Sequence, residues 1–192
     1  MKKLISLLVV LSMLLCGVAC AETAETVMYE PSYYMLEDLM GATIPAPENA
    51  AYEGTWIAFD SGLVVYHPND LAILPLTEEQ VAVNCFFNSI TEDASLSYNI
   101  SYTPVPEGTV LADQVESLSA ISDKVEYFVL NDIEFITYDV ADPGVTGLIM
   151  SDPLNWAIYT FTFGPLSNEN LDLFLDTFIR SISVLTFEQA AE

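Results

Sequence analysis

Four β-type segments follow one another between residues 125 and 163, with only two to four residues between them. They cover residues 125–130, 133–140, 145–151 and 156–163. Each connection is short and contains Asp or Asn, and the two longer ones also contain Pro, which are residue types that favour tight turns. The spacing therefore predicts four strands that meander antiparallel.

Further strands are expected before this meander. Residues 55–59 and 63–66 read as a hairpin whose loop is Asp60-Ser61-Gly62, because glycine can take the positive φ that a three-residue loop needs. Residues 96–102 alternate apolar and polar side chains, which predicts a half-buried strand. The remaining expectations are extended segments at 71–76 and 82–89, with capping-box spacing for a helical turn from Thr77 to Gln80.

Three segments have the apolar spacing of amphipathic helices. The first, 33–40, has an apolar side that we expect to dock on the rest of the chain, and the second is 109–121. The third follows Ser167, which we expect to cap it, with Glu169 near its positive end. The apolar positions are Tyr33, Leu36, Leu39 and Met40; then Leu111, Val115, Leu118 and Ile121 or Ser122; then Leu171, Phe174, Leu175, Phe178 and Ile182.

Each helix has one apolar face that a sheet must cover, so the fold class is α+β, a mostly antiparallel β-sheet flanked by helices. The 192 residues suit one core. The expected organisation is a signal peptide over 1–21, an N-terminal extension with a short helix over 22–50, a single α+β domain over 51–186, and a tail over 187–192.

The first residues have the pattern of a secretory signal peptide. Lys2 and Lys3 precede an apolar run that is too short to span a membrane, and small residues surround a cleavage position after Ala21. The alternative is a lipoprotein signal in which Cys20 is lipidated and becomes the first residue, although Gly17 replaces the usual Leu of that signal. The sequence therefore predicts a secreted or cell-envelope protein exported by a bacterium, without a membrane span.

The charge is strongly negative: 28 Asp and Glu stand against 4 Lys and Arg. Loss of residues 1–21 leaves Lys124 and Arg180 as the basic residues, a formal net charge of −26. Nucleic acids and anionic lipids need Lys and Arg to neutralise phosphate, so nucleic-acid binding is excluded. The apolar half of the composition excludes a disordered acidic protein.

No catalytic motif is recognisable, and the sequence predicts a protein that is not an enzyme and has no cofactor. His67 is the one histidine, precedes Pro68 at a strand end, and is given a structural or exposed role. Asp60-Ser61-Gly62 occurs once, whereas an aspartic protease needs two such carboxylates, so a hairpin turn is favoured. Cys85 lacks neighbouring cations and reads as a buried, inert thiol.

Two kinds of site stay open as alternatives. Paired carboxylates can serve a hydrolase, and 28 acidic residues do not identify which pair. Asp139, Asp142 and Asp152 lie near turns whose carbonyl groups are further ligands for Ca²⁺, although turn formation explains them equally well. Asn99-Ile100-Ser101 matches a glycosylation acceptor and reads as a chance match within a strand.

Five short motifs stand out between residues 54 and 185. They are Trp56-Ile57-Ala58-Phe59, Tyr66-His67-Pro68, the run from Asn131 to Tyr138, Phe161-Thr162-Phe163 with Pro165, and Ile179-Arg180-Ser181-Ile182. With these motifs, residues 54–185 resemble the PsbP-like group of folds, which includes the DcrB-like envelope proteins. The resemblance implies a mostly antiparallel sheet flanked by helices and a non-enzymatic accessory or binding role, and it carries over no functional residue. The ligand or partner is expected to be an envelope or extracellular molecule.

Overall fold

The structure is a computed structural model that describes residues 27–152 and 154–185. The chain divides into two compact units, which are described separately. The first unit combines Met1–Pro31 with Ile73–Asn168, and the second combines Ser32–Ala72 with Glu169–Glu192. The predicted signal peptide and tail lie outside the described residues, and the domain ranges stay a prediction.

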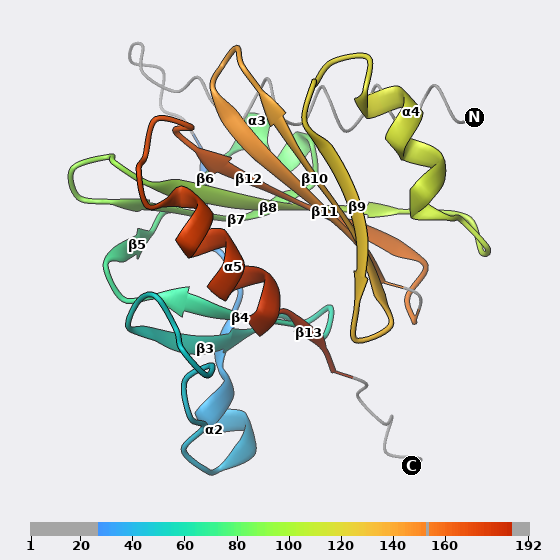
Figure 1. Ribbon diagram of the computed structural model, residues 1–192. Helices are drawn as coiled ribbons and strands as arrows, with labels where there is room; N and C mark the ends of the chain where they lie inside the picture. The colour runs from blue at the N-terminus through green and yellow to red at the C-terminus, as the bar shows by residue number, and fades with distance from the viewer. Residues whose placement is uncertain (1–26, 153, 186–192) are drawn as a thin grey trace. The chain divides into compact units, whose positions relative to one another are not determined.

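A seven-stranded sheet has the strand order β5-β7-β8-β12-β11-β10-β9, and its strands β7 to β12 belong to the first unit (Figure 1). The predicted meander is confirmed, because β9, β10, β11 and β12 pair antiparallel in succession. The mostly antiparallel α+β fold class is confirmed as well. The strands are β5 (Leu71–Ile73), β7 (Cys85–Thr91), β8 (Ser97–Pro104), β9 (Val125–Leu130), β10 (Ile133–Val140), β11 (Val145–Asp152) and β12 (Ala157–Gly164).

The loop between β9 and β10 consists of Asn131 and Asp132, whose φ angles are 52° and 64°. Two consecutive positive φ angles are typical of the tight hairpin turn that matches the strand twist, and Asn and Asp tolerate them well. The two strands then pair without interruption from Leu130↔Ile133 to Val125↔Tyr138.

Strand β8 differs from the half-buried strand that we expect from its alternation. Tyr98 and Ile100 are fully buried as predicted, but Asn99 and Ser101 on the other side are buried too. The reason is that β8 is an inner strand, with β7 on one side and β12 on the other. Asn99 and Ser101 are paired across the ladder with threonines of β12, so small polar side chains share that face.

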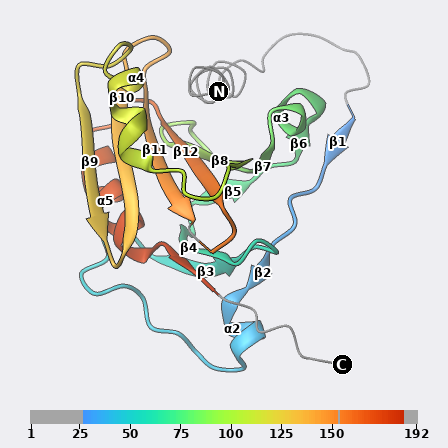
Figure 2. The same ribbon diagram turned by 90° about the vertical axis from the view of Figure 1, so that its right-hand side faces the viewer.

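One side of the sheet is covered by a short helical segment made of η1 (Leu111–Gln114) and α4 (Val115–Leu118). It lies beside β9 and β10 in both views (Figures 1 and 2). The segment is shorter than the predicted helix 109–121, because Val110 is extended and the chain turns after Leu118. Leu111 and Leu118 are buried as predicted, in a cluster with Ile136, Tyr138, Ile149 and Ile158.

A small two-stranded sheet pairs β1 (Met28–Tyr29) with β6 (Leu76–Thr77). The predicted capping box is present at the start of α3 (Glu78–Ala82), where Thr77 and Gln80 exchange hydrogen bonds. The strand expected over 82–89 therefore starts later, at Cys85, because Ala82 still belongs to the helix.

The second unit has a four-stranded sheet with the order β13-β4-β3-β2. The predicted hairpin is confirmed, and Gly62 takes the expected positive φ of 85°. Helix α5 packs on β4, with Phe174 and Phe178 buried as predicted. The elements are β2 (Tyr34–Met35), α2 (Leu36–Met40), β3 (Gly54–Ala58), β4 (Leu63–Pro68), α5 (Leu171–Ser181) and β13 (Ser183–Val184).

Two helix expectations in this unit are wrong in part. The segment 33–40 begins as strand β2, which pairs with β3, and of its expected apolar stripe Leu36 is buried while Leu39 and Met40 are 48% and 63% exposed. Helix α5 starts after Asn170, so Ser167 lies too far upstream to cap it. In the turn before α5, the Asn168 N–H instead donates to the Pro165 carbonyl.

Candidate functional site

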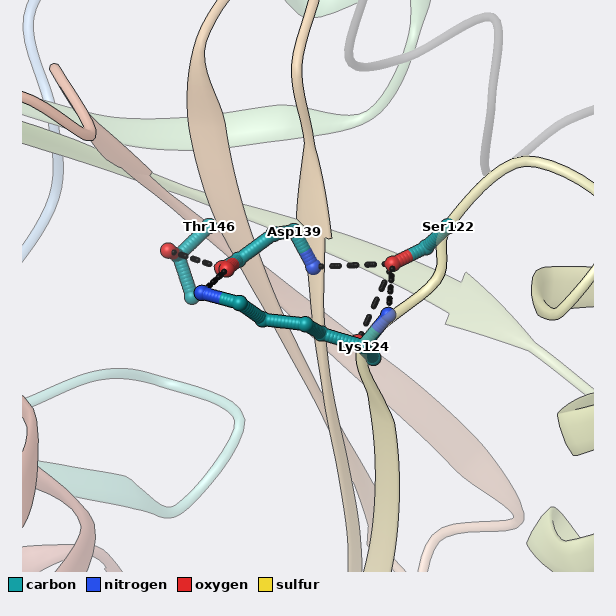
Figure 3. A network of polar contacts seen from close by, with 4 residues as sticks. All are labelled: Ser122, Lys124, Asp139 and Thr146. Atoms are coloured by element: carbon teal, nitrogen blue, oxygen red, sulfur yellow. Dashed lines mark hydrogen bonds and ion pairs between the residues drawn. The ribbon is translucent and has the colours of Figure 1, made fainter.

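Asp139, one of the three proposed calcium ligands, has its carboxylate engaged within the protein (Figure 3). One oxygen lies 2.9 Å from the Lys124 Nζ atom, and the other accepts a hydrogen bond of 2.7 Å from the Thr146 hydroxyl. The backbone N–H groups of Lys124 and Asp139 both donate to the Ser122 Oγ atom, at 3.1 and 3.2 Å. This network joins the start of β9 to β10 and gives each carboxylate oxygen of Asp139 a partner within the protein.

The other two proposed calcium ligands lie elsewhere. Asp142 is exposed in the turn between β10 and β11. Asp152 is buried, and its carboxylate accepts hydrogen bonds from the backbone N–H groups of Leu154 and Asn155 and from the Asn155 side chain. Within the described residues, no three His, Cys, Asp or Glu side chains come together in a way that could hold a metal ion.

His67 is buried in the second unit, near the end of β4. Its Nε2 atom lies 2.9 Å from the Leu71 carbonyl oxygen, which can only accept, so Nε2 carries a proton. Burial lowers the pKa of this imidazole from its ordinary value, and the Leu71 carbonyl and Asp70 oppose that shift. This arrangement is the structural role that the sequence predicts.

The remaining residues singled out by sequence have local structural roles. Asp60-Ser61-Gly62 forms the loop between β3 and β4, and Asp60 accepts a hydrogen bond of 3.4 Å from Ser32. Cys85 is buried, and its Sγ atom lies 3.5 Å from the Phe87 carbonyl oxygen. Asn99 is 8% exposed within β8, where a glycan would have no room.

The first unit also contains a pocket of about 190 Å³, which we call the acidic pocket. It lies at the N-terminal end of η1, between Leu111 and the adjoining ends of β10, β11 and β12. Its apolar lining includes Val105, Leu111, Ile158 and Trp156; Thr109 and Ser151 contribute hydroxyl groups, and Asp132, Glu134 and Asp152 also line it.

Glu134 is the fixed acidic group of this pocket. Its Oε1 atom accepts a hydrogen bond of 2.6 Å from the Tyr127 hydroxyl of β9, and its Oε2 atom accepts one of 3.1 Å from the backbone N–H of Leu111. The hydrogen bond to Glu134 raises the pKa of the Tyr127 hydroxyl, because it stabilises the protonated phenol. The carboxylate is thus held by the helical segment on one side and by the edge strand on the other.

The lining of the acidic pocket offers mainly hydrogen-bond acceptors. No Lys, Arg or His is among the lining residues. The Thr109 hydroxyl donates to the Pro106 carbonyl and the Ser151 hydroxyl to the Glu134 carbonyl, so these protons are already used. Asp132 is exposed in the β9–β10 turn. Such a lining suits a positively charged group attached to an apolar chain.

Exposed apolar side chains surround this pocket. Trp156 lines it and is 39% exposed, and Tyr127, which holds Glu134, is also 39% exposed. Val129 faces Glu134 across the β9–β10 pair and is 55% exposed, and Val110 precedes Leu111 and is 49% exposed. Exposed apolar groups around a polar centre are typical of binding surfaces.

Sequence reasoning missed the acidic pocket. Its residues come from the loop before η1, the start of η1, the β9–β10 turn, the ends of β10, β11 and β12, and the β11–β12 connection. The signal that was present is the placement of Asp132 in a predicted turn and of Trp156 directly after one, because side chains in turns are free to take part in binding. Only the sheet register brings these turns together.

Comparisons with known proteins give a likeness of fold. No protein-family model and no curated protein matches the chain. The solution structure of cyanobacterial PsbP (CyanoP) from Synechocystis sp. PCC 6803 superposes with a TM-score of 0.49 and 12% sequence identity, covering 88% of this chain and 99% of that one. Among the described residues, no helix has both the length and the apolar character needed to span a bilayer. The solved structure carries the PsbP name that the sequence resemblance also gives.

Proposed function

We propose that this protein is an exported, acidic, non-catalytic binding module that takes a cationic group of its ligand into the acidic pocket. The observation that carries the proposal is the pocket lining, in which Asp132 and Glu134 stand among apolar side chains without any basic residue. Carboxylates attract an ammonium or guanidinium group, and the Trp156 ring can add a cation–π contact.

The size of the pocket favours a small group. Its volume of about 190 Å³ is below the roughly 300–1,000 Å³ of pockets that enclose drug-sized ligands. A lysine-like side chain or a small alkylamine fits this volume better than a sugar or a nucleotide. The proposed ligand is therefore an amine, or a protein or peptide that presents a basic side chain.

Binding is tested by NMR titration with Nα-acetyl-lysine methylamide, and with the norleucine analogue as a neutral probe of the same length. We expect saturable shifts of the Leu111 and Trp156 amides with the lysine probe only, and at least threefold weaker binding in Asp132→Asn. Glu116→Gln removes an exposed carboxylate of α4 that does not line the pocket, so it is the matched control. Equal weakening in both variants would mean unspecific charge attraction.

A carboxylate hydrolase is the second candidate, because Asp132 and Glu134 line one pocket. Glu134 is better arranged to hold a ligand than to transfer a proton, since both of its oxygens accept hydrogen bonds from the protein. Turnover of a glycoside or ester panel that disappears in Glu134→Gln would support the hydrolase and contradict the binding module.

Export and anchoring belong to the same proposal. Intact mass of the protein recovered from an exporting bacterial host distinguishes cleavage after Ala21 from a lipidated Cys20. A mass that retains residues 1–21 would contradict export.

A further inference from the structure

Strand β9 forms one end of the seven-stranded sheet. Within the described residues, it pairs with β10 and with no other strand. It has six residues, whereas the opposite edge strand, β5, has three, and the edge strands β13 and β2 of the other sheet have two each. In an antiparallel pair, every second residue of an edge strand turns its backbone N–H and C=O outward. β9 is thus the longest sheet edge in the described part of the chain.

Three common means of blocking a sheet edge, Pro, Lys and a bulge, are missing from β9. Its sequence, Val125 to Leu130, contains no Pro, Gly or Lys. Its register with β10 runs through six pairs without a bulge. Exposed edges commonly carry Pro, Lys or a bulge that prevents another strand from pairing. An edge of this length without them is suited to accept a strand.

The side chains along this edge also suit a partner. Tyr127 and Val129 project on the same side of the sheet, and they are 39% and 55% exposed. An added strand would cover them with its own alternating side chains, and cross-strand pairs of aromatic and aliphatic residues stabilise a sheet. Glu126, on the other side of β9, is exposed as well.

The edge is held in place before any partner arrives. Ser122, Lys124 and Asp139 fix the start of β9 to β10 (Figure 3), and the Tyr127 hydroxyl is bonded to Glu134. A fixed edge loses little conformational entropy when a strand is added, which favours binding.

We infer that the β9 edge accepts an extended, basic segment of a partner protein as an additional strand. Charge selects this occupant: Asp123 and Glu126 are exposed at or beside β9, while the neighbouring Lys124 is paired with Asp139. A second copy of the chain would bring the same acidic edge, with a formal charge of −24 on each copy. Like charges across an interface oppose association, whereas Lys or Arg on the added strand is attracted. This inference does not depend on the acidic pocket.

The test uses a short blocked peptide in which Lys and Val alternate, with fluorescence anisotropy for affinity and amide hydrogen exchange for location. We expect binding, with slower exchange at β9. The Glu126→Lys variant should lose at least about tenfold in affinity for the peptide, because it reverses a charge on the edge. The matched control is Glu116→Lys, which makes the same charge change on α4 and should alter affinity less than about twofold.

Two control peptides separate strand addition from simple charge attraction. The same peptide with a central Pro lacks a backbone donor and should bind weakly, and the peptide with Glu in place of Lys should not bind.

Equal losses in Glu126→Lys and Glu116→Lys, or exchange protection away from β9, would overturn the inference. Concentration-dependent dimerisation that protects β9 would also overturn it, because the occupant would then be a second copy. Intact peptide binding in Asp132→Asn separates this edge from the acidic pocket.

Discussion

Gly147 of β11 lies directly opposite Tyr138 of β10 in the sheet. The Tyr138 ring is buried and occupies the space where a side chain at residue 147 would lie. A Cβ atom on Gly147 would collide with the carbon atoms and the hydroxyl group of that ring. The ring also belongs to the cluster that holds η1 and α4 on the sheet, so the absence of a side chain at one position allows a whole layer to pack.

Gly147→Ala should therefore destabilise the protein by about 1–3 kcal/mol through overpacking. The measurement is urea unfolding. The control is the same change in a Tyr138→Leu background, where the aromatic ring is gone and the added methyl group should cost much less. A cost that is the same in both backgrounds would show that the ring is not the cause.

His67 predicts a pH dependence. Because burial lowers its pKa in the folded state, the unfolded chain takes up a proton first as pH falls below about 6.5. The stabilising contribution of the neutral imidazole is therefore present above that pH and is lost below it. When the pH falls from 6.5 to 5, the free energy of unfolding should change less favourably in the unchanged chain than in His67→Gln, which lacks the imidazole. Identical slopes in urea unfolding at several pH values would contradict this.

At the scale of elements, the attachment of β9 to β10 depends on a hydroxyl group more than on an ion pair. The Ser122 Oγ atom is the acceptor for two backbone N–H groups and donates to the Lys124 carbonyl at 3.0 Å. The Lys124 side chain is 80% exposed, so solvent weakens its attraction to Asp139.

Ser122→Ala should cost about 1–3 kcal/mol, because it removes the Ser122 acceptor of the Lys124 N–H and leaves the Asp139 N–H with only the Lys124 carbonyl at 3.3 Å. Lys124→Met should change stability by less than about 1 kcal/mol, since an exposed ion pair contributes little. Thermal unfolding of both variants checks the order. A larger loss in Lys124→Met would show that the ion pair is the main attachment.

The elements that sequence predicts well are those whose signals are local. The β9–β12 meander follows from alternation and short turns, and the Thr77 capping box depends on residues three positions apart. The elements that it predicts poorly depend on distant partners. Tyr34 is extended because it pairs with Ala58 of β3, and the polar side of β8 is buried because it is an inner strand. The acidic pocket has the same origin, since it is assembled from η1, the ends of three strands and the loops beside them.

At the scale of the whole molecule, the acidic side chains have few basic partners. Within the described residues, the two ion pairs are Lys124 with Asp139 and Arg180 with Asp176. Because the chain has 28 acidic residues and 4 basic ones, the carboxylates repel one another across the surface.

Added neutral salt should therefore raise the melting temperature, because screening weakens this repulsion. In His67→Gln, where the histidine no longer opposes the effect, stability should rise modestly from neutral pH towards 5 as some carboxylates take up protons. Scanning calorimetry over a salt series and a pH series makes both measurements. A monotonic loss on acidification in this variant would indicate that paired carboxylates dominate.

The second unit is built from the beginning and the end of the chain. Strand β13 pairs with β4, the Ser181 hydroxyl accepts from the Tyr66 N–H, and the Thr177 hydroxyl accepts from the Ala51 N–H. During synthesis, residues 32–72 leave the ribosome about a hundred residues before these partners exist. This unit can close only after the residues of α5 and β13 have left the ribosome, so residues 32–72 stay without these partners while the first unit is synthesised. Ribosome-stalled chains ending before residue 169 should stay sensitive to protease in this region, and release of the full-length chain should make it resistant.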